Sequence, residues 1–295
     1  MDNKMIDLDA ADDKGQSAVF YANKNECNEA LCELIARGAD FKLDEIDDDC
    51  KKNLLFKAAE MNNGYLIWQL YNLKGFDPNT TDDEGKTAVL YANKYGSTAA
   101  LYELIQCGAD FEFDDIDDIC AKDVLFTAAE MDNSYVISLL YFGGFDLNAT
   151  DYEGKTAVYR ANKYKSTNAL YALILHGANF KLDEIDDDCA KKVLFKAAEM
   201  DECCVVNALD YQGFDFNVTD DEGKTAVYYA NENKSTNVLY ELIHYDPDFV
   251  LPEIDDDCAK KVLFKAAEMN HRYVIWDLNF EGFDLNATDD EGKSA

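Results

Sequence analysis

Clusters of aspartate recur along the chain and are its densest groups of chemically active side chains. Grouped carboxylates can hold a calcium ion, attract segments rich in lysine or arginine, or keep a protein edge solvated. The EF-hand calcium motif needs alternating ligands, a glycine at its sixth position and a glutamate at its twelfth, and the clusters lack this pattern. A solvated edge and a docking rail for basic segments remain open alternatives. The clusters are Asp47, Asp48 and Asp49; Asp117 and Asp118; Asp186, Asp187 and Asp188; and Asp255, Asp256 and Asp257.

A second recurring feature is a Glu-Met pair that follows two alanines. Methionine at helical spacing commonly fills a core, but Met and Tyr also suit adaptable binding surfaces. Because a glutamate precedes each methionine, we expect these methionines to be partly exposed. Tyr95 and Tyr164 hold the matching place in the alternate half-modules. The pairs are Glu60 with Met61, Glu130 with Met131, Glu199 with Met200, and Glu268 with Met269.

Histidine and cysteine show no pattern typical of catalysis or metal binding. His176, His244 and His271 are scattered, without a serine or cysteine at the spacing of a nucleophile elbow or a triad. The nine cysteines form no Cys-x-x-Cys pair, so we predict free thiols that fill core positions. We therefore expect a protein that is not an enzyme, with no metal site, no cofactor and no small-molecule substrate.

The charge balance limits the partners. Of 295 residues, 60 are acidic and 27 are basic, which gives a formal charge of −33 at pH 7. This charge disfavours nucleic acids and anionic membranes, because both are bound through lysine and arginine, and it attracts basic proteins. Residues 1–7 lack the basic and apolar regions of a secretory signal. We expect a soluble, cytoplasmic monomer.

A repeat of 69 residues organises the chain. Residues 184–200 are identical to residues 253–269. Five glycines in equivalent positions are separated by 70 residues and then three times by 69, namely Gly15, Gly85, Gly154, Gly223 and Gly292. Self-similarity of this kind indicates stacked units that bury their apolar faces against their neighbours.

Each module contains two halves, and each half predicts two short helices. In the half-module 82–115, Thr87 is a suitable N-cap for the first helix, and Ser97 and Thr98 are candidate caps for the second. Gly108 then ends the second helix in a left-handed conformation. Neither helix pair is expected to be stable alone, because each has to bury its apolar stripe against a neighbour.

These halves resemble the ankyrin repeat, a unit of about 33 residues with a β-turn finger and two antiparallel helices. The first halves carry this signature at residues 82–92, and their closing phrase Gly-Ala-Asp stands at residues 38–40 and 108–110. In the second halves, residues 144–149 resemble the family's Gly-Ala-Asp-Val-Asn-Ala. The resemblance implies an all-α, ankyrin-type solenoid of stacked helix-turn-helix repeats with finger loops, whose concave face recognises proteins.

The resemblance also implies a domain organisation. We expect a single solenoid over residues 12–288, with eight repeats in four double modules. Residues 1–11 are then a lead-in, and residues 289–295 begin a further repeat, which leaves open that the chain is a fragment. The modules are residues 12–81, 82–150, 151–219 and 220–288.

Departures from the family pattern affect the fingers and one helix. Residues 87–90 read Thr-Ala-Val-Leu where the family has Thr-Pro-Leu-His, so the Thr-His hydrogen bond that tightens the finger is missing. The second halves lack the finger glycine, and we expect irregular loops there. One extra residue between Tyr71 and Lys74 is expected to distort the end of a helix.

Together these features predict a scaffold for protein interaction. We expect its concave face to bind basic, partly apolar protein segments, with the aspartate clusters as a ladder along one edge and the methionines beside it. Two alternatives remain: an acidic array or weak cation buffer without a specific partner, and a fragment of a larger protein whose activity lies elsewhere.

Overall fold

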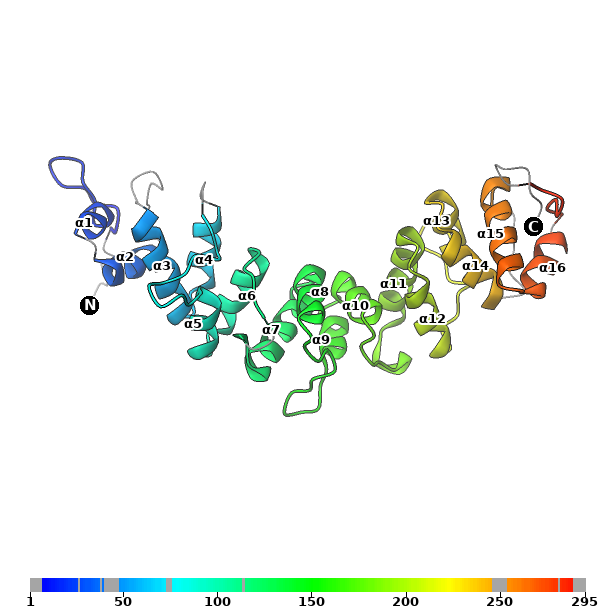
Figure 1. The fold of residues 1–295 in the computed structure, drawn as a ribbon, viewed down its shortest axis with the longest axis horizontal. Helices are drawn as coiled ribbons and strands as arrows, with labels where there is room; N and C mark the ends of the chain where they lie inside the picture. The colour runs from blue at the N-terminus through cyan, green and yellow to red at the C-terminus, as the bar shows by residue number, and fades with distance from the viewer. Residues whose placement is uncertain are drawn as a thin grey trace. The chain divides into compact units, whose positions relative to one another are not determined.

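Helices form nearly all the regular structure of the computed structural model, which describes residues 7–25, 27–37, 39, 48–72, 76–112, 115–245, 254–280 and 282–288 (Figure 1). The first helices of the pairs are α1 (Ala18–Lys24), α3 (Asp48–Glu60), α5 (Ala88–Lys94), α7 (Asp118–Glu130), α9 (Ala157–Lys163), α11 (Asp187–Met200), α13 (Ala226–Glu232) and α15 (Asp256–Glu268). The second helices are α2 (Asn28–Ala36), α4 (Gly64–Tyr71), α6 (Thr98–Gln106), α8 (Ser134–Phe142), α10 (Thr167–Leu175), α12 (Cys203–Tyr211), α14 (Thr236–Tyr245) and α16 (Arg272–Phe280). Isolated bridges join Thr81 to Thr87 and Thr219 to Thr225.

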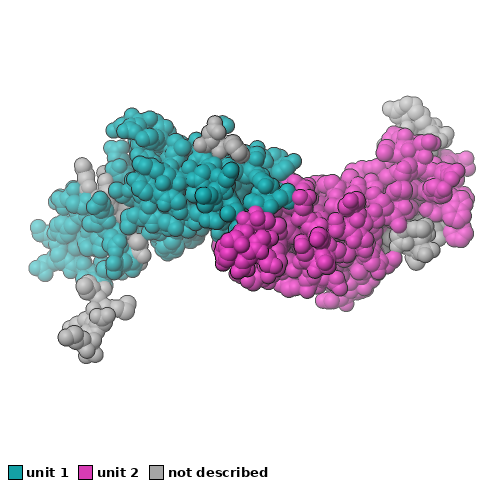
Figure 2. Space-filling model, turned by 90° about the horizontal axis from the view of Figure 1, so that it is seen from below, with its two compact units in different colours: residues 1–128, 135–149 teal, residues 129–134, 150–295 magenta. Residues whose placement is uncertain are grey.

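The helices belong to two compact units, residues 1–128 with 135–149 and residues 129–134 with 150–295 (Figure 2). In the first unit, α3 packs against α4 and α5, and α4 packs against α6. In the second unit, α11 packs against α12 and α13, and α12 packs against α14. First helices therefore lie against first helices and second helices against second helices. Each unit is thus a two-layer stack of helix pairs, in which neighbouring pairs bury their apolar stripes against each other.

Small and branched side chains allow this close packing. In α3, Leu54, Leu55, Ala58 and Ala59 are completely buried. The paired alanines are good helix formers and add little bulk, so the neighbouring helix can approach the backbone. The apolar face of each first helix thus packs in the core.

The first helices of the first halves begin as predicted. The hydroxyl oxygen of Thr87 accepts the backbone N–H of Leu90 at 3.4 Å, and Ser17, Thr156 and Thr225 cap their helices in the same way. The predicted left-handed glycine is also confirmed, because Gly108, two residues after the end of α6, has φ of 81°.

An aspartate and a tyrosine tighten the first-half fingers, where the Thr-His bond of the family is missing. The carboxylate of Asp82 accepts the backbone N–H groups of Glu84 and Lys86 at 2.8 and 2.9 Å, and it accepts the hydroxyl of Tyr91 at 2.7 Å. The Tyr91 hydrogen bond lowers the pKa of Asp82 below its ordinary value. The equivalent bonds join Tyr21 to Asp12, Arg160 to Asp151, and Tyr229 to Asp220. A buttress that the sequence analysis did not identify therefore replaces the missing bond.

The second helices of the first halves are capped by the preceding repeat. Ser97 occupies the N-cap position of α6 as predicted, but its hydroxyl donates to the carbonyl of Glu60 at 3.3 Å. The cap comes instead from Asn62, whose side-chain oxygen accepts the N–H of Ala100 at 3.0 Å. Asn62 can reach this position because its backbone is left-handed, with φ of 55°. Asp132 and Asp201 cap α10 and α14 in the same manner.

The connection into the second half of the third module follows the expected irregular course. Within residues 179–186 the regular structure is the short 3-10 turn η3 (Leu182–Glu184). At the predicted distortion, α4 has 8 residues, whereas α8, α12 and α16 have 9 each. Residues 73–75, which hold the rest of that segment, lie outside the described residues.

A carboxyl group between α4 and α6 makes stability depend on pH. The Oε2 atom of Glu103 and the Oε1 atom of Gln69 are both buried without a hydrogen-bond partner among the described residues, and burial raises the pKa of Glu103. A carboxyl whose pKa is higher in the folded state stabilises the fold below its unfolded pKa, and this contribution is lost as pH rises through the folded value.

We therefore expect Glu103→Gln to raise the melting temperature at pH 7, while the variant and the natural protein converge near pH 4. The exposed Glu112→Gln serves as the control for the loss of one negative charge. Thermal unfolding followed by circular dichroism checks the result. An equal gain at both pH values would contradict it.

Candidate partner-binding surface

The aspartate clusters lie at the start of the long first helices, and the first members of three of them act as N-caps. The carboxylate of Asp117 accepts the backbone N–H of Cys120, and that of Asp255 accepts the N–H of Cys258, both at 2.8 Å. Asp186 caps α11. These caps order the helix starts and place the following carboxylates at the positive end of the helix dipole.

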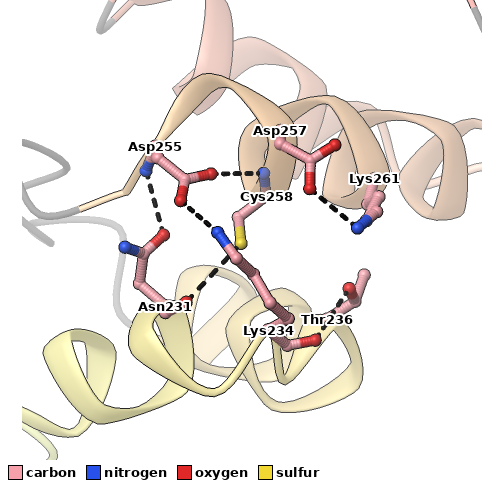
Figure 3. A network of polar contacts seen from close by, with 7 residues as sticks. All are labelled: Asn231, Lys234, Thr236, Asp255, Asp257, Cys258 and Lys261. Carbon is pink, nitrogen blue, oxygen red and sulfur yellow. Dashed lines mark hydrogen bonds and ion pairs between the residues drawn. The ribbon is translucent and has the colours of Figure 1, made fainter.

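An asparagine from the preceding first helix holds each of these caps. Figure 3 shows the backbone N–H of Asp255 donating to Asn231 Oδ1 at 2.9 Å, while Lys234 pairs with the Asp255 carboxylate. The Lys234 hydrogen bond holds the pKa of Asp255 below its ordinary value. Equivalent bonds of 2.9 Å join Asp117 to Asn93 and Asp186 to Asn162. The first aspartates of these three clusters, Asp117, Asp186 and Asp255, therefore have a structural role and are already occupied.

The second aspartate of three clusters is available to a partner. Asp118, Asp187 and Asp256 are exposed and form no ion pair with any residue that the structure describes. Asp49 is exposed as well, whereas Asp47 lies outside the described residues. Other members pair with a lysine of their own helix, namely Asp48 with Lys51, Asp188 with Lys192 and Asp257 with Lys261. Each module with a described cluster thus offers at least one free carboxylate.

The four methionines are exposed, as predicted. Met61, Met131, Met200 and Met269 are 51%, 61%, 60% and 57% exposed. Met61, Met131 and Met269 directly follow α3, α7 and α15, and Met200 is the last residue of α11. All four lie beyond the point where the buried alanines end. An exposed thioether at every such end provides an adaptable apolar contact.

The preceding glutamates divide into two groups. Glu60 pairs with Lys57 at 2.8 Å, and Glu130 pairs with Arg160, so both are partly buried and engaged. Glu199 and Glu268 are exposed. The four glutamates therefore occupy equivalent positions in the repeat, but only Glu199 and Glu268 are exposed to a partner.

Tyr95 and Tyr164 end α5 and α9 and are about half exposed. Lys94 lies over the ring of Tyr95 at 5.1 Å, and Lys163 lies over that of Tyr164 at 5.5 Å. These cation–π contacts hold the lysines at the ends of the helices, where a positive charge also complements the dipole.

One expectation about the arrangement is wrong: the carboxylates and the methionines do not lie beside each other. In α15, Asp256 is the first residue and Glu268, which precedes Met269, is the last. Twelve residues at 1.5 Å each separate the two ends by about 18 Å. Acidic and apolar contacts of one repeat therefore occupy opposite ends of the same helix.

The structure brings together two histidines that the sequence analysis treated as scattered. The rings of His244 and His271 lie 4.5 Å apart, and Tyr240 contacts both. Because their separation along the chain does not follow the module period, no sequence signal marks the pair. Across the described ranges, no group of three or more His, Cys, Asp or Glu side chains is placed to hold a metal ion.

The periodic cysteines fill the core as free thiols, as predicted. Cys50, Cys120, Cys189 and Cys258 are buried and unbridged. Burial raises the pKa of Cys120 to about 11, so its thiol stays protonated. Such groups are poor nucleophiles.

Comparison with known proteins identifies the fold. The family model described as ankyrin repeats (3 copies) matches residues 19–115, 55–151 and 194–289. The chain belongs to the ankyrin repeat family. The predicted all-α ankyrin fold is confirmed, and ankyrin repeats are in general modules for protein–protein interaction.

Several ankyrin proteins are similar over part of their length. An ankyrin repeat domain-containing protein of Stachybotrys chartarum is 28% identical over 156 residues, which are 52% of this chain and 8% of that protein. The B-cell lymphoma 3 protein homolog of Mus musculus is 31% identical over 105 residues, 36% of this chain and 23% of that protein. A putative ankyrin repeat protein of fowlpox virus is 24% identical over 172 residues, 57% of this chain and 24% of that protein. The ankyrin chain therefore matches about a quarter or less of each relative.

Among solved structures, the human ASB11 ankyrin repeat domain is similar. It is 18% identical, and the match covers 78% of this chain and 98% of that domain with a TM-score of 0.28. Within the described ranges of the present chain, none of the helices combines the length and the apolar character that crossing a membrane would need.

Proposed function

We propose that this ankyrin chain is a non-catalytic scaffold that binds basic, partly apolar segments of other proteins along its first helices. The observation that carries the proposal is the free carboxylate at the start of α7, α11 and α15, in a chain with a formal charge of −33. The exposed methionine at the far end of each helix supplies the apolar contact. Charge favours fast association with a basic partner, and the thioether favours retention.

The length of the first helices specifies the partner further. A segment that contacts both ends of one helix spans about 18 Å. At roughly 3.3 Å per residue in an extended chain, its basic and apolar residues are then about five or six positions apart. The proposal includes a monomeric protein with eight repeats in a single solenoid, acting in the cytoplasm, where its unbridged thiols stay reduced.

A fluorescent peptide provides the test, with two lysines and two leucines separated by about five serine and glycine residues. We expect the variant Asp118→Asn, Asp187→Asn, Asp256→Asn to bind this probe about tenfold more weakly, because a free carboxylate is lost in three modules while the caps remain. Fluorescence anisotropy in about 0.1 M salt gives the affinity, and binding should weaken as salt is added.

A matched variant removes the same charge from the tips of the first-half fingers. Asp13, Asp83 and Asp221 are exposed, and their change to asparagine alters the net charge equally. We expect this control to bind nearly as well as the natural protein. If both variants lose affinity equally, bulk charge alone governs binding and the acidic array without a specific partner is the better description.

A further inference from the structure

A cavity of the same construction recurs in three modules. Each cavity lies between the first turns of a first helix and the loop after the second helix of the same repeat. The volumes are about 170, 260 and 360 Å³ in the first, second and fourth modules. The equivalent lining residues are Asp48, Lys52, Leu55, Phe76 and Asp77; Asp118, Lys122, Leu125, Phe145 and Asp146; and Asp256, Lys260, Leu263, Phe283 and Asp284.

Carboxylates from two different segments line each cavity. In the second module, Asp118 comes from the first turn of α7 and Asp146 from the loop after α8. The loop is held by a hydrogen bond, because Asp146 Oδ1 accepts the backbone N–H of Asn148 at 2.8 Å. The same bond recurs from Asn79 to Asp77 and from Asn286 to Asp284, both at 2.9 Å. The position of the loop carboxylate is therefore preset in all three cavities.

The rest of the lining is apolar. Leu125 and Phe145 line the second-module cavity and are 2% and 7% exposed. Ile119 forms part of its wall and is 69% exposed, so a ligand can still cover apolar surface there. This combination suits a ligand with an aliphatic stem and a cationic head.

A lysine at the edge of each cavity adds a donor. Lys122 and Lys260 are partly buried, and neither forms an ion pair with any residue in the described ranges. An ammonium group without a carboxylate partner can donate to a peptide carbonyl. The cavity therefore offers contacts to a side chain and to the backbone that carries it.

We infer that each cavity holds one lysine or arginine side chain of a bound protein segment, an assignment that rests on the proposed function. The methylene stem lies over the leucine and phenylalanine, the cationic head lies between the two carboxylates, and the cavity lysine donates to a neighbouring carbonyl of the segment. An acidic side chain in the cavity would face two carboxylates and one ammonium group, so the cavity would repel it. An uncharged aliphatic side chain leaves the carboxylates without a donor, which is costly.

The three cavities differ in charge, which predicts an order of affinity. The second- and fourth-module cavities carry two carboxylates and one ammonium group. In the first module, Lys51 also lines the cavity and pairs with Asp48 at 2.8 Å. The first-module cavity should therefore bind a cation most weakly.

Methyl NMR of the leucines in the cavities tests the assignment. The probe is N-acetyl-arginine methylamide, added to the full chain with labelled leucine methyl groups. We expect saturable shifts at Leu125 and Leu263 and weaker ones at Leu55. N-acetyl-norleucine methylamide has a stem without a charge, and N-acetyl-glutamate methylamide has the opposite charge. Neither should give saturable shifts, and equal responses to arginine and norleucine would overturn the inference.

Variants of the loop aspartates separate this assignment from the wider proposal. Asp146→Asn keeps the oxygen that accepts the Asn148 N–H but removes the charge, and we expect arginine to bind about tenfold more weakly at Leu125 with no change at Leu263. Asp83→Asn is the control and should alter neither. Unchanged arginine binding in Asp146→Asn would rule out the cavity site.

The lysine-leucine peptide separates the two claims further. If the peptide still depends on Asp118, Asp187 and Asp256 while arginine fails to bind, the scaffold proposal stands and the cavity assignment falls. If arginine binds the cavities while the peptide ignores those aspartates, the scaffold proposal falls.

Discussion

Gly64→Ala is expected to destabilise the first unit by about 2 kcal/mol, although alanine is ordinarily the better helix former. Gly64 is the buried first residue of α4, where α6 crosses it. A Cβ atom placed there would lie 2.7 Å from the carbonyl oxygen of Ala99 and 2.8 Å from Cγ of Glu103. The helices would have to separate, because a backbone oxygen cannot move aside as a side chain can.

Urea unfolding of the first unit can be followed alone, because the two tryptophans lie in different units. In a Trp276→Phe background, Trp68 on α4 is the remaining indole and reports on the first unit. We expect a lower midpoint for Gly64→Ala at an unchanged slope. Adding Glu103→Ala should restore only part of the loss, since the carbonyl contact remains. Full restoration would show that the Glu103 side chain, and not the Ala99 backbone, limits the approach.

The periodic features of this ankyrin chain could be predicted from its sequence because they depend on local chemistry. Thr87 caps a helix through its own hydroxyl, and Gly108 ends one through its own backbone freedom. The exposure of Met61 follows from its place just beyond the buried alanines. Each of these predictions needs only the neighbouring residues in the chain.

The features that could not be predicted depend on contacts between repeats. Ser97 stands where a cap belongs, yet its hydroxyl bonds to Glu60, 37 positions earlier, and Asn62 supplies the cap. The Asp82 and Tyr91 pair recurs in three of the four modules, with Arg160 in place of the tyrosine in the third, but tyrosine at a helical spacing is equally typical of a core residue. Periodicity shows that such residues matter without showing which partner each one has.

At the candidate site, too, some features follow from the local sequence and others depend on contacts in the folded chain. The aspartate clusters are evident in the sequence, but whether a carboxylate is free depends on a few ångströms of side-chain placement. The Asp255 carboxylate caps α15 and pairs with Lys234, whereas the adjacent Asp256 forms no ion pair with any described residue. The separation of carboxylates from methionines follows from where the helix begins, and cluster positions alone do not determine that start.

Asp201→Ala is expected to destabilise the second unit by about 3 kcal/mol. The Asp201 carboxylate accepts the backbone N–H groups of Asn237 and Val238 at 2.8 and 3.0 Å and the Asn237 side-chain amide at 2.7 Å. It thereby joins the end of α11 to the start of α14. Its backbone is left-handed, with φ of 57°, which alanine tolerates poorly.

Two further substitutions separate the cap from the backbone strain. Asp201→Gly loses the three hydrogen bonds but accepts the positive φ, so it should be about 1 kcal/mol more stable than Asp201→Ala. Asp201→Asn retains an acceptor and tolerates the conformation, as Asn62 does in the first module, so we expect it to stay within about 1 kcal/mol of the natural protein. The exposed Asp221→Ala controls for charge. In a Trp68→Phe background, Trp276 on α16 reports urea unfolding of the second unit. Equal midpoints for Asp201→Asn and Asp201→Ala would show that the carboxylate does not act as a cap, because the two variants differ most in their ability to accept the N–H groups of α14.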